Sequence, residues 1–128
     1  MPSVIAICIG ASLGALARWG LALWLTPGGM IPWGTLAANL IGGYLIGVCI
    51  AVFQSMPDLD PVWRLLLVTG FLGGLTTFSS FSAEVVLYMT EARYGLAFFT
   101  AAVHMAGSFL MTFAGLKSAM FFIAYRAA

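Results

Sequence analysis

Charged side chains are scarce in this sequence, and their scarcity decides the class of protein. Only nine of the 128 residues carry charge, five basic and four acidic, which is 7% of the chain. Soluble domains hold about 25% charged residues, so this chain cannot cover a water-exposed surface. Hydrophobic residues make up 62% of the sequence, and the mean hydropathy is +1.07. These values exclude an ordinary soluble domain and predict an integral membrane protein.

Few residues are available for metal, redox or nucleic-acid chemistry. The chain has one histidine and two cysteines, and Cys8 and Cys49 lie far apart in separate apolar runs. That spacing fits neither a zinc site nor a redox pair, and a buried cysteine commonly acts as a small apolar residue. The net charge of +1 excludes the basic face of a nucleic-acid-binding protein. The expected surroundings are membrane lipid, with no nucleic acid among the partners.

Four apolar blocks follow one another along the chain. A membrane span needs about 20 apolar residues, so four spans fit this length and leave only short loops. The blocks predict one four-helix transmembrane domain over residues 1–128, with helices at about 3–25, 33–53, 62–89 and 94–125. The third block is longer than a membrane requires, and two adjacent glycines interrupt it. We expect the third helix to be broken over Gly73–Thr77, because the glycines favour unwinding.

Pairs of glycines four residues apart recur in the first three blocks. Such pairs let two helix backbones approach closely inside a membrane, where lipid supplies no hydrophobic drive for association. They predict close helix packing and indicate no particular function. The pairs are Gly10 and Gly14, Gly43 and Gly47, and Gly70 and Gly74.

The charged residues give almost no preference for one orientation in the membrane. With four spans, both termini and the loop at 54–61 lie on one side. The basic residues divide three to two between the sides, with Arg64, Lys117 and Arg126 against Arg18 and Arg93. Because basic residues normally mark the cytoplasmic side, this near-tie allows two interpretations. Either another feature orients the protein, or copies insert both ways and pair as an antiparallel dual-topology homodimer.

Polar residues inside the spans lie in register on helix faces. A polar group within lipid is costly unless it finds a partner or lines water. Thr35 and Asn39 are four residues apart, and hence share one face of the second helix. The fourth helix carries a stripe at steps of four residues, namely Thr100, His104, Ser108 and Thr112. A single Ser or Thr often bonds back to its own helix, but four polar residues in register favour a polar path.

The third block holds the densest polar segment. Five hydroxyl residues lie within seven positions, namely Thr76, Thr77, Ser79, Ser80 and Ser82. Unwound backbone at membrane depth must be satisfied by protein, water or an ion, and freed carbonyls suit a hard cation such as Na⁺. Phe78 and Phe81 are three apart among these hydroxyls, so both project from one side. They face either lipid and core or the same polar path.

An acidic centre is missing from the spans. Glu84 is the only carboxylate within one of them, and Arg18 on the first helix is a possible partner for it. A polar path without carboxylate rings is a poor cation channel and a poor proton-coupled exporter. Hydroxyls, an amide and the partly positive edges of aromatic rings favour an anion instead.

Three segments carry motifs that are specific to one known family of membrane proteins. The most specific is GFLGGLTTFSSFSAE (Gly70–Glu84), and the other two are GTLAANLIG (Gly34–Gly42) and GASLGALARW (Gly10–Trp19). In that order they resemble the third-helix signature and the second-helix and first-helix motifs of the Fluc (CrcB-type) fluoride channels. The departures are small, since Ser80 replaces a more usual Thr and Trp19 a more usual Tyr. Members differ among themselves at the position of His104.

The resemblance implies an antiparallel dual-topology dimer with two fluoride pores along the subunit interface. It implies a central structural Na⁺ that is not transported and is bound by the carbonyls of Gly73 and Thr76 from both subunits. Asn39 is then a pore-lining donor, and Phe78 and Phe81 from opposite subunits form an aromatic box. Arg18 is expected in a positive vestibule. The other expected pore residues are Thr35, Ser79, Ser80, His104, Ser108 and Thr112.

The sequence thus predicts a passive fluoride channel in the inner (plasma) membrane that lowers cytoplasmic fluoride, with no enzyme chemistry. Two alternatives belong to other classes. A small four-helix multidrug exporter works through a carboxylate on its first helix, and this chain has none there. A non-transporting structural subunit of a membrane complex would carry no ion flux as purified protein in liposomes.

Overall fold

The computed structural model of the protein describes residues 1–29 and 31–128. Within these residues, four helical stretches are long and apolar enough to cross a membrane, which confirms the expected all-helical membrane class. They are α1 (Pro2–Leu25), α2 (Trp33–Ser55), a segmented third span (Pro61–Thr90) and α6 (Tyr94–Ala127). The third span consists of α3 (Pro61–Arg64), the π-helical segment η1 (Leu65–Leu72), α4 (Gly73–Leu75) and α5 (Phe78–Thr90).

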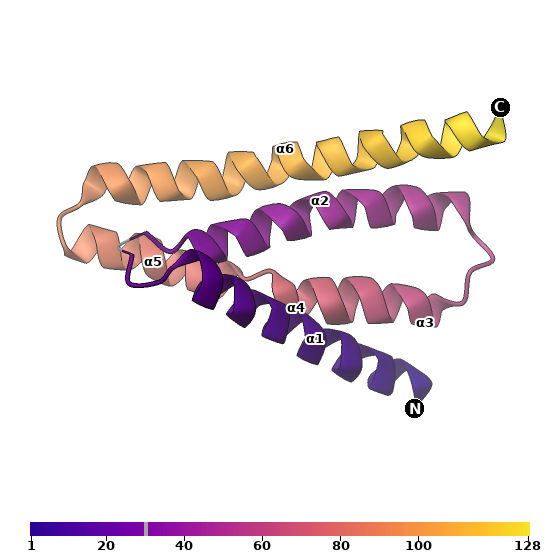
Figure 1. The fold of residues 1–128 in the computed structure, drawn as a ribbon, viewed down its shortest axis with the longest axis horizontal. Coiled ribbons are helices and arrows are strands. Elements are labelled where there is room, and N and C mark those ends of the chain that lie inside the picture. Colours follow the sequence, from indigo (N-terminus) through magenta and orange to yellow (C-terminus); the bar gives the residue numbers. More distant parts are fainter. Residues whose placement is uncertain (30) are drawn as a thin grey trace.

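The helices pack in two groups, α1 with η1 and α4 in one and α6 with α5 in the other, and α2 packs against both groups. Figure 1 shows α2 between α6 and the third span, with α1 crossing the third span obliquely. The most extensive packing joins α2 to α6, and α1 packs mainly on η1 and α4. Both termini and the α2–α3 connection lie at the same end of the molecule (Figure 1), as four spans require.

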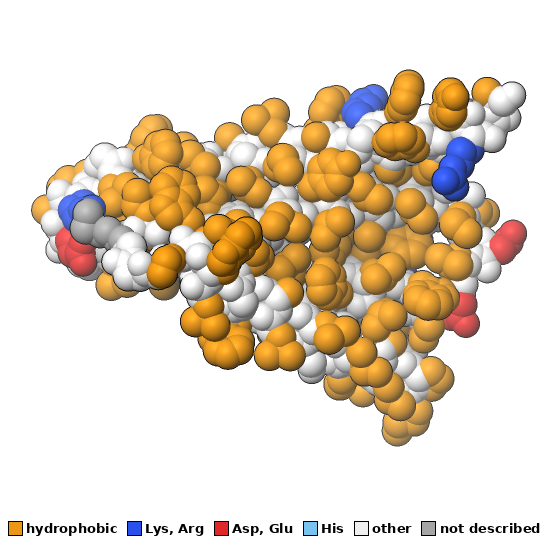
Figure 2. All heavy atoms as spheres, in the orientation of Figure 1, with side chains coloured by type: hydrophobic (Ala, Val, Ile, Leu, Met, Phe, Trp, Pro, Cys, Tyr) orange, Lys and Arg blue, Asp and Glu red, His pale blue; other side chains and the backbone are white. Residues whose placement is uncertain are grey.

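The outer surface matches a lipid environment. Figure 2 shows apolar side chains along the length of the molecule, with acidic side chains at its two ends and basic ones at or toward the ends. Large apolar side chains are exposed on all four spans, among them Leu13, Ile41, Val86 and Phe109. Lipid can cover such a surface without cost, whereas a soluble protein rarely exposes apolar patches of this extent.

Glycine makes the close helix contacts possible. A Cβ atom on Gly14 would collide with the backbone carbonyl of Phe71, and one on Gly74 with that of Ala11. On the other side of the molecule, a Cβ on Gly47 would collide with the backbone of α6. All six glycines of the predicted pairs lie against backbone atoms of a neighbouring segment, and Gly43 has the least tight contact of the six. The pairs therefore have the packing role that the sequence predicts.

Gly14→Val is expected to disrupt the packing of α1 against the third span and to lower the thermal stability of the protein strongly. Overpacking costs about 1–3 kcal/mol in typical cores, and backbone atoms cannot rotate away as side chains do. Gly20→Val is the matched control on the same helix, because nothing lies within 4 Å of its Cβ position. Thermal unfolding in detergent, with gel filtration of each variant, measures the difference. Equal melting temperatures for the two variants would contradict the close contact at Gly14.

Candidate functional site

The third span is interrupted at two threonines. Gly73 retains helical dihedral angles (φ −62°, ψ −35°), and α4 continues to Leu75. Thr76 (φ −81°, ψ 154°) and Thr77 (φ −151°, ψ 116°) are extended, and α5 begins at Phe78. The break thus lies within the predicted range, but the expectation that the two glycines unwind is wrong. The Gly74 position is held helical because α1 packs directly against it.

Side chains replace the helical hydrogen bonds on both sides of the break. Arg18 Nε donates to the carbonyl of Gly74 at 3.1 Å. Asn39 accepts from the N–H of Thr77 at 2.8 Å and donates to the carbonyl of the same residue at 3.0 Å. The Thr77 hydroxyl then caps α5 by accepting from the N–H of Ser80 at 3.1 Å. An unwound peptide at membrane depth is tolerated because protein groups satisfy it in this way.

The carbonyls of Gly73 and Thr76 are among those that lose their helical donors. In a continuous helix the N–H of Thr77 would bond the carbonyl of Gly73, but here it bonds Asn39. Likewise the N–H of Ser80 bonds the Thr77 hydroxyl in place of the carbonyl of Thr76. Among the described residues no cluster of three or more His, Cys, Asp or Glu side chains could hold a metal ion. The oxygen atoms at this break are backbone carbonyls and the hydroxyls of Thr76 and Thr77.

A cavity of about 430 Å³ opens beside the break, with walls from α2, the third span and α6. Seven of the predicted site residues line it, namely Asn39, Gly73, Thr76, Phe78, Phe81, His104 and Ser108. The remaining lining residues are Gly42, Gly43, Ile46, Val68, Leu72, Thr77, Met105 and Phe109. Residues predicted from three separate segments thus share one space, although 65 positions separate Asn39 from His104.

Thr77 is the site residue that sequence reasoning missed. It appeared there only as one hydroxyl among five, yet its peptide is held by Asn39 and its side chain caps α5. Its side chain also contacts the hydroxyls of Ser79 and Ser80 at 3.2 and 3.1 Å. The available indication was its place at the end of the expected break, since Thr is a favoured N-cap where a helix resumes.

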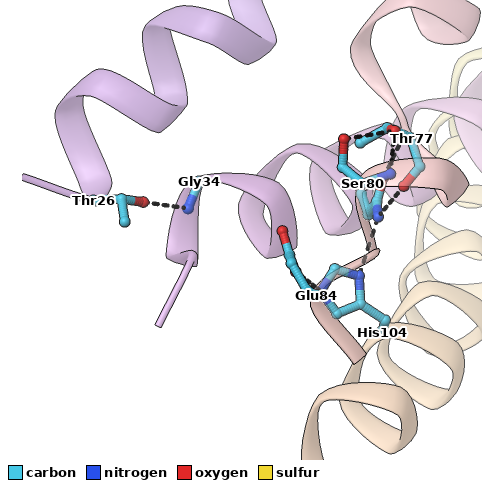
Figure 3. A network of polar contacts seen from close by, with 7 residues as sticks. Thr26, Gly34, Thr77, Ser80, Glu84 and His104 are labelled. Carbon is cyan, nitrogen blue, oxygen red and sulfur yellow. Dashed lines mark hydrogen bonds and ion pairs between the residues drawn. The ribbon is translucent and has the colours of Figure 1, made fainter. Parts of the chain in front are cut away.

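A polar chain leads from the break into α6 and α5. Asn39 Nδ2 lies 3.1 Å from His104 Nδ1, and His104 Nε2 lies 3.9 Å from Glu84 Oε2. Figure 3 shows Glu84 and His104 pointing toward one another, with Thr77 and Ser80 nearby. The Oε2 atom of Glu84 is a buried oxygen without a hydrogen bond in the described structure. Polar groups of three helices are therefore linked within the membrane span.

The suggested pairing of Arg18 with Glu84 is wrong. Arg18 bonds the Gly74 carbonyl, whereas Glu84 lies against His104. The reason is topological, because α1 packs on η1 and α4 while α5 packs on α6. The two residues consequently belong to different packing groups.

Phe78 and Phe81 differ sharply in exposure. Phe81 is 7% exposed and Phe78 is 71% exposed. Their rings meet edge to face, with centroids 5.4 Å apart and planes at 79°. Phe81 also stacks on the His104 ring, with centroids 4.5 Å apart and planes at 18°. Phe81 is therefore fixed inside the chain, while Phe78 projects from it.

The predicted polar stripe of α6 faces α2 and α5. Thr100 and His104 are buried and line a small pocket together with Glu84. Ser108 lines the large cavity, and the hydroxyl of Thr112 lies beside Gly43 of α2. The predicted residues outside the large cavity are Arg18, Thr35, Ser79, Ser80 and Thr112, of which Arg18, Ser79 and Ser80 bond residues at or beside the break.

Comparison with known proteins identifies the family of the chain. The profile of the family described as CrcB-like protein, Camphor Resistance (CrcB), matches residues 5–116. The chain belongs to the CrcB family. A CrcB relative from Albidiferax ferrireducens, named fluoride-specific ion channel FluC, is 70% identical over 125 residues, covering 98% of this chain and 96% of its own.

Further CrcB relatives carry the same name. The protein of Paracidovorax citrulli is 62% identical over 122 residues, covering 95% of this chain and 97% of its own. That of Pseudomonas aeruginosa is 56% identical over 117 residues, covering 91% and 92%. The segment matched by the CrcB profile contains every residue that lines the large cavity. This CrcB chain is accordingly a multi-pass membrane protein whose cavity lies within the family region.

Proposed function

We propose that the protein is a fluoride channel of the plasma membrane, which lets fluoride leave the cell and so lowers its cytoplasmic concentration. The relatives named fluoride-specific ion channel support this function, and it requires no enzyme chemistry. The observation that carries the proposal is the chemistry of the 430 Å³ cavity. Its described lining offers hydroxyl, amide, imidazole and aromatic groups and includes no carboxylate.

This lining suits a small anion. Moving a bare ion into a low-dielectric interior costs tens of kcal/mol in the Born limit, so a path must replace water with donors. Fluoride is small and accepts hydrogen bonds strongly, and the hydroxyl of Ser108 can donate to it. The hydroxyls of Thr76 and Thr77 already donate to the Leu72 carbonyl and to the Ser80 hydroxyl, so they reach fluoride by exchanging those bonds. The aromatic edges of Phe78 and Phe81 add partial positive charge. Both amide hydrogens of Asn39 are engaged within the chain, so fluoride reaches Asn39 by exchanging with one of those bonds.

The proposed assembly is an antiparallel homodimer with a pore on each side of the subunit interface. Support comes from the open cavity of a single chain and from the exposure of Phe78, which is 71%. In an antiparallel pair, Phe78 of one subunit would face Phe81 of the other and complete an aromatic box. The near-equal division of basic residues between the two ends is consistent with insertion in both orientations.

A structural Na⁺ at the centre of this dimer belongs to the same proposal. The carbonyls of Gly73 and Thr76 have lost their helical donors and would hold the ion together with the same carbonyls of the second subunit. Oxygen donors of this kind suit a hard cation. Arg18, bonded to the neighbouring Gly74 carbonyl, contributes positive charge toward the vestibule.

Fluoride flux from purified protein in liposomes tests the function directly. A fluoride gradient should discharge rapidly through the reconstituted protein, while an equal chloride gradient persists. Protein-free vesicles control for leak. Equal chloride and fluoride flux, or no flux from protein of verified assembly, would contradict a fluoride-selective channel.

Removal of Na⁺ should weaken the assembly. Purification with a large organic cation in place of Na⁺ is expected to lower the dimer fraction in gel filtration and the fluoride flux, because the carbonyls at the break then lack their cation. Restoring Na⁺ should recover both. If neither quantity changes while Na⁺ is verified to be absent, the cation site has no structural role.

A further inference from the structure

The orientation of the Asn39 side-chain amide is fixed by a group that can only donate. The backbone N–H of Thr77 lies 2.8 Å from one terminal atom of that amide, which must therefore be the oxygen. The NH₂ group then faces the Thr77 carbonyl at 3.0 Å and His104 Nδ1 at 3.1 Å. Both hydrogens of the amide are thus directed at acceptors.

This orientation determines the proton position on the imidazole ring. Because the NH₂ group of Asn39 can only donate, His104 Nδ1 must accept and carries no proton. The proton of the neutral ring then lies on Nε2, which faces Glu84 Oε2 at 3.9 Å. The second nitrogen of a histidine is set by the bond that the first one makes. The contacts on both nitrogens are consistent with the same tautomer.

The orientation of the His104 ring is also fixed by its neighbours. His104 is 5% exposed, and one face stacks on Phe81 with centroids 4.5 Å apart. Among the described residues, Glu84 on α5 is the one charged group paired with it, and Asn39 on α2 is its hydrogen-bond partner. Neighbours on two helices therefore hold the ring on three sides.

We infer that His104 is a positioning residue, held as the neutral Nε2–H tautomer, which orients the Asn39 amide and through it the unwound peptide of Thr77. A proton on Nδ1 would point at the NH₂ group of Asn39, and two donors cannot form a hydrogen bond with each other. Turning the amide would then place its NH₂ group against the N–H of Thr77 and its oxygen against the Thr77 carbonyl. The wrong tautomer consequently costs the bond to His104 or both bonds to Thr77.

The tautomer can be measured because the chain has a single histidine. Protein labelled with ¹⁵N-histidine and freed of any tag gives the NMR spectrum of one ring. We expect Nε2 to be protonated and Nδ1 to be unprotonated and hydrogen-bonded. In Asn39→Ala, the Nδ1 signal should move toward that of a nitrogen with no hydrogen bond, whereas Gln54→Ala, at the exposed end of α2, should leave it unchanged. A protonated Nδ1 in the wild type, or no movement in Asn39→Ala, would overturn the inference.

Rescue by a conservative variant tests whether the positioning of Asn39 by His104 matters for fluoride conduction. This part of the inference rests on the proposed channel activity. The side-chain oxygen of His104→Asn takes about the place of Nδ1, while His104→Leu offers no acceptor. We expect His104→Leu to lose most fluoride flux per assembled protein and His104→Asn to retain clearly more. Equal flux in both variants, or wild-type flux in His104→Leu, would overturn the positioning role. If the wild type carries no fluoride, the proposed function fails, and the NMR measurement still decides the tautomer.

Discussion

Phe81→Ile is expected to yield an assembled protein with fluoride flux reduced by at least about tenfold, which corresponds to about 1.4 kcal/mol in the barrier. Isoleucine lacks the partly positive ring edge that favours an anion. It also cannot stack on His104, so the ring that faces Asn39 loses its support on one side. Fluoride flux per folded protein in liposomes measures the effect, with assembly checked by gel filtration.

Two further variants separate these causes. Phe78→Ile removes a ring that is 71% exposed in the single chain and meets Phe81 edge to face, so it tests the aromatic edge without removing the stack on His104. Its flux should also fall strongly. Phe98→Ile is the control, because Phe98 is 77% exposed on α6 and lies outside the cavity lining. Wild-type flux in both Phe78→Ile and Phe81→Ile would assign these rings to ordinary packing.

Asn39→Asp is expected to abolish most fluoride flux and to lower stability. An ionised carboxylate has no hydrogens to donate, so it would face the Thr77 carbonyl and His104 Nδ1 as a third acceptor. Each buried polar group left without a partner costs about 1–3 kcal/mol, and the added negative charge repels an approaching anion. Liposome flux and thermal unfolding measure the two consequences.

The matched control makes the same chemical change elsewhere on the helix. Gln54→Glu also converts an amide to a carboxylate on α2, but at its exposed end and outside the large cavity. It should leave flux and stability close to those of the wild type. Retained flux in Asn39→Asp, with its carboxylate verified to be ionised, would show that Asn39 neither lines the pore nor needs its hydrogen bonds to the Thr77 peptide for conduction.

Asn39 and Arg18 illustrate how much of the candidate site could be predicted from the sequence. The spacing of Thr35 and Asn39 indicated one polar helix face, and the resemblance to the Fluc family suggested a donor that lines a pore. The structure gives Asn39 an additional task, since its amide bonds both polar groups of the Thr77 peptide. Arg18 was expected as a vestibule charge, and its Nε also holds the Gly74 carbonyl. Neither contact could be predicted, because each joins positions more than 35 residues apart.

The break in the third span separates local from tertiary causes even more clearly. Local propensity assigned the unwinding to the adjacent glycines, since glycine lacks a Cβ atom. In the fold, α1 approaches Gly74 so closely that this segment is packed as helix. The unwinding falls instead on Thr76 and Thr77, where Asn39 and a capping hydroxyl satisfy the freed groups. Tertiary packing therefore moved the break away from the residues with the greatest intrinsic flexibility.

The sequence by itself determined the membrane class, the four spans, the close-packing glycines and the family. These properties follow from composition, from apolar length and from short motifs, all of which are local in the chain. Only the tertiary structure decided which polar groups meet, because partners such as Asn39, Thr77, His104 and Glu84 come from different helices. The physical reason is that hydrogen bonds at membrane depth must be satisfied within the protein, and the helix packing determines which donor reaches which acceptor.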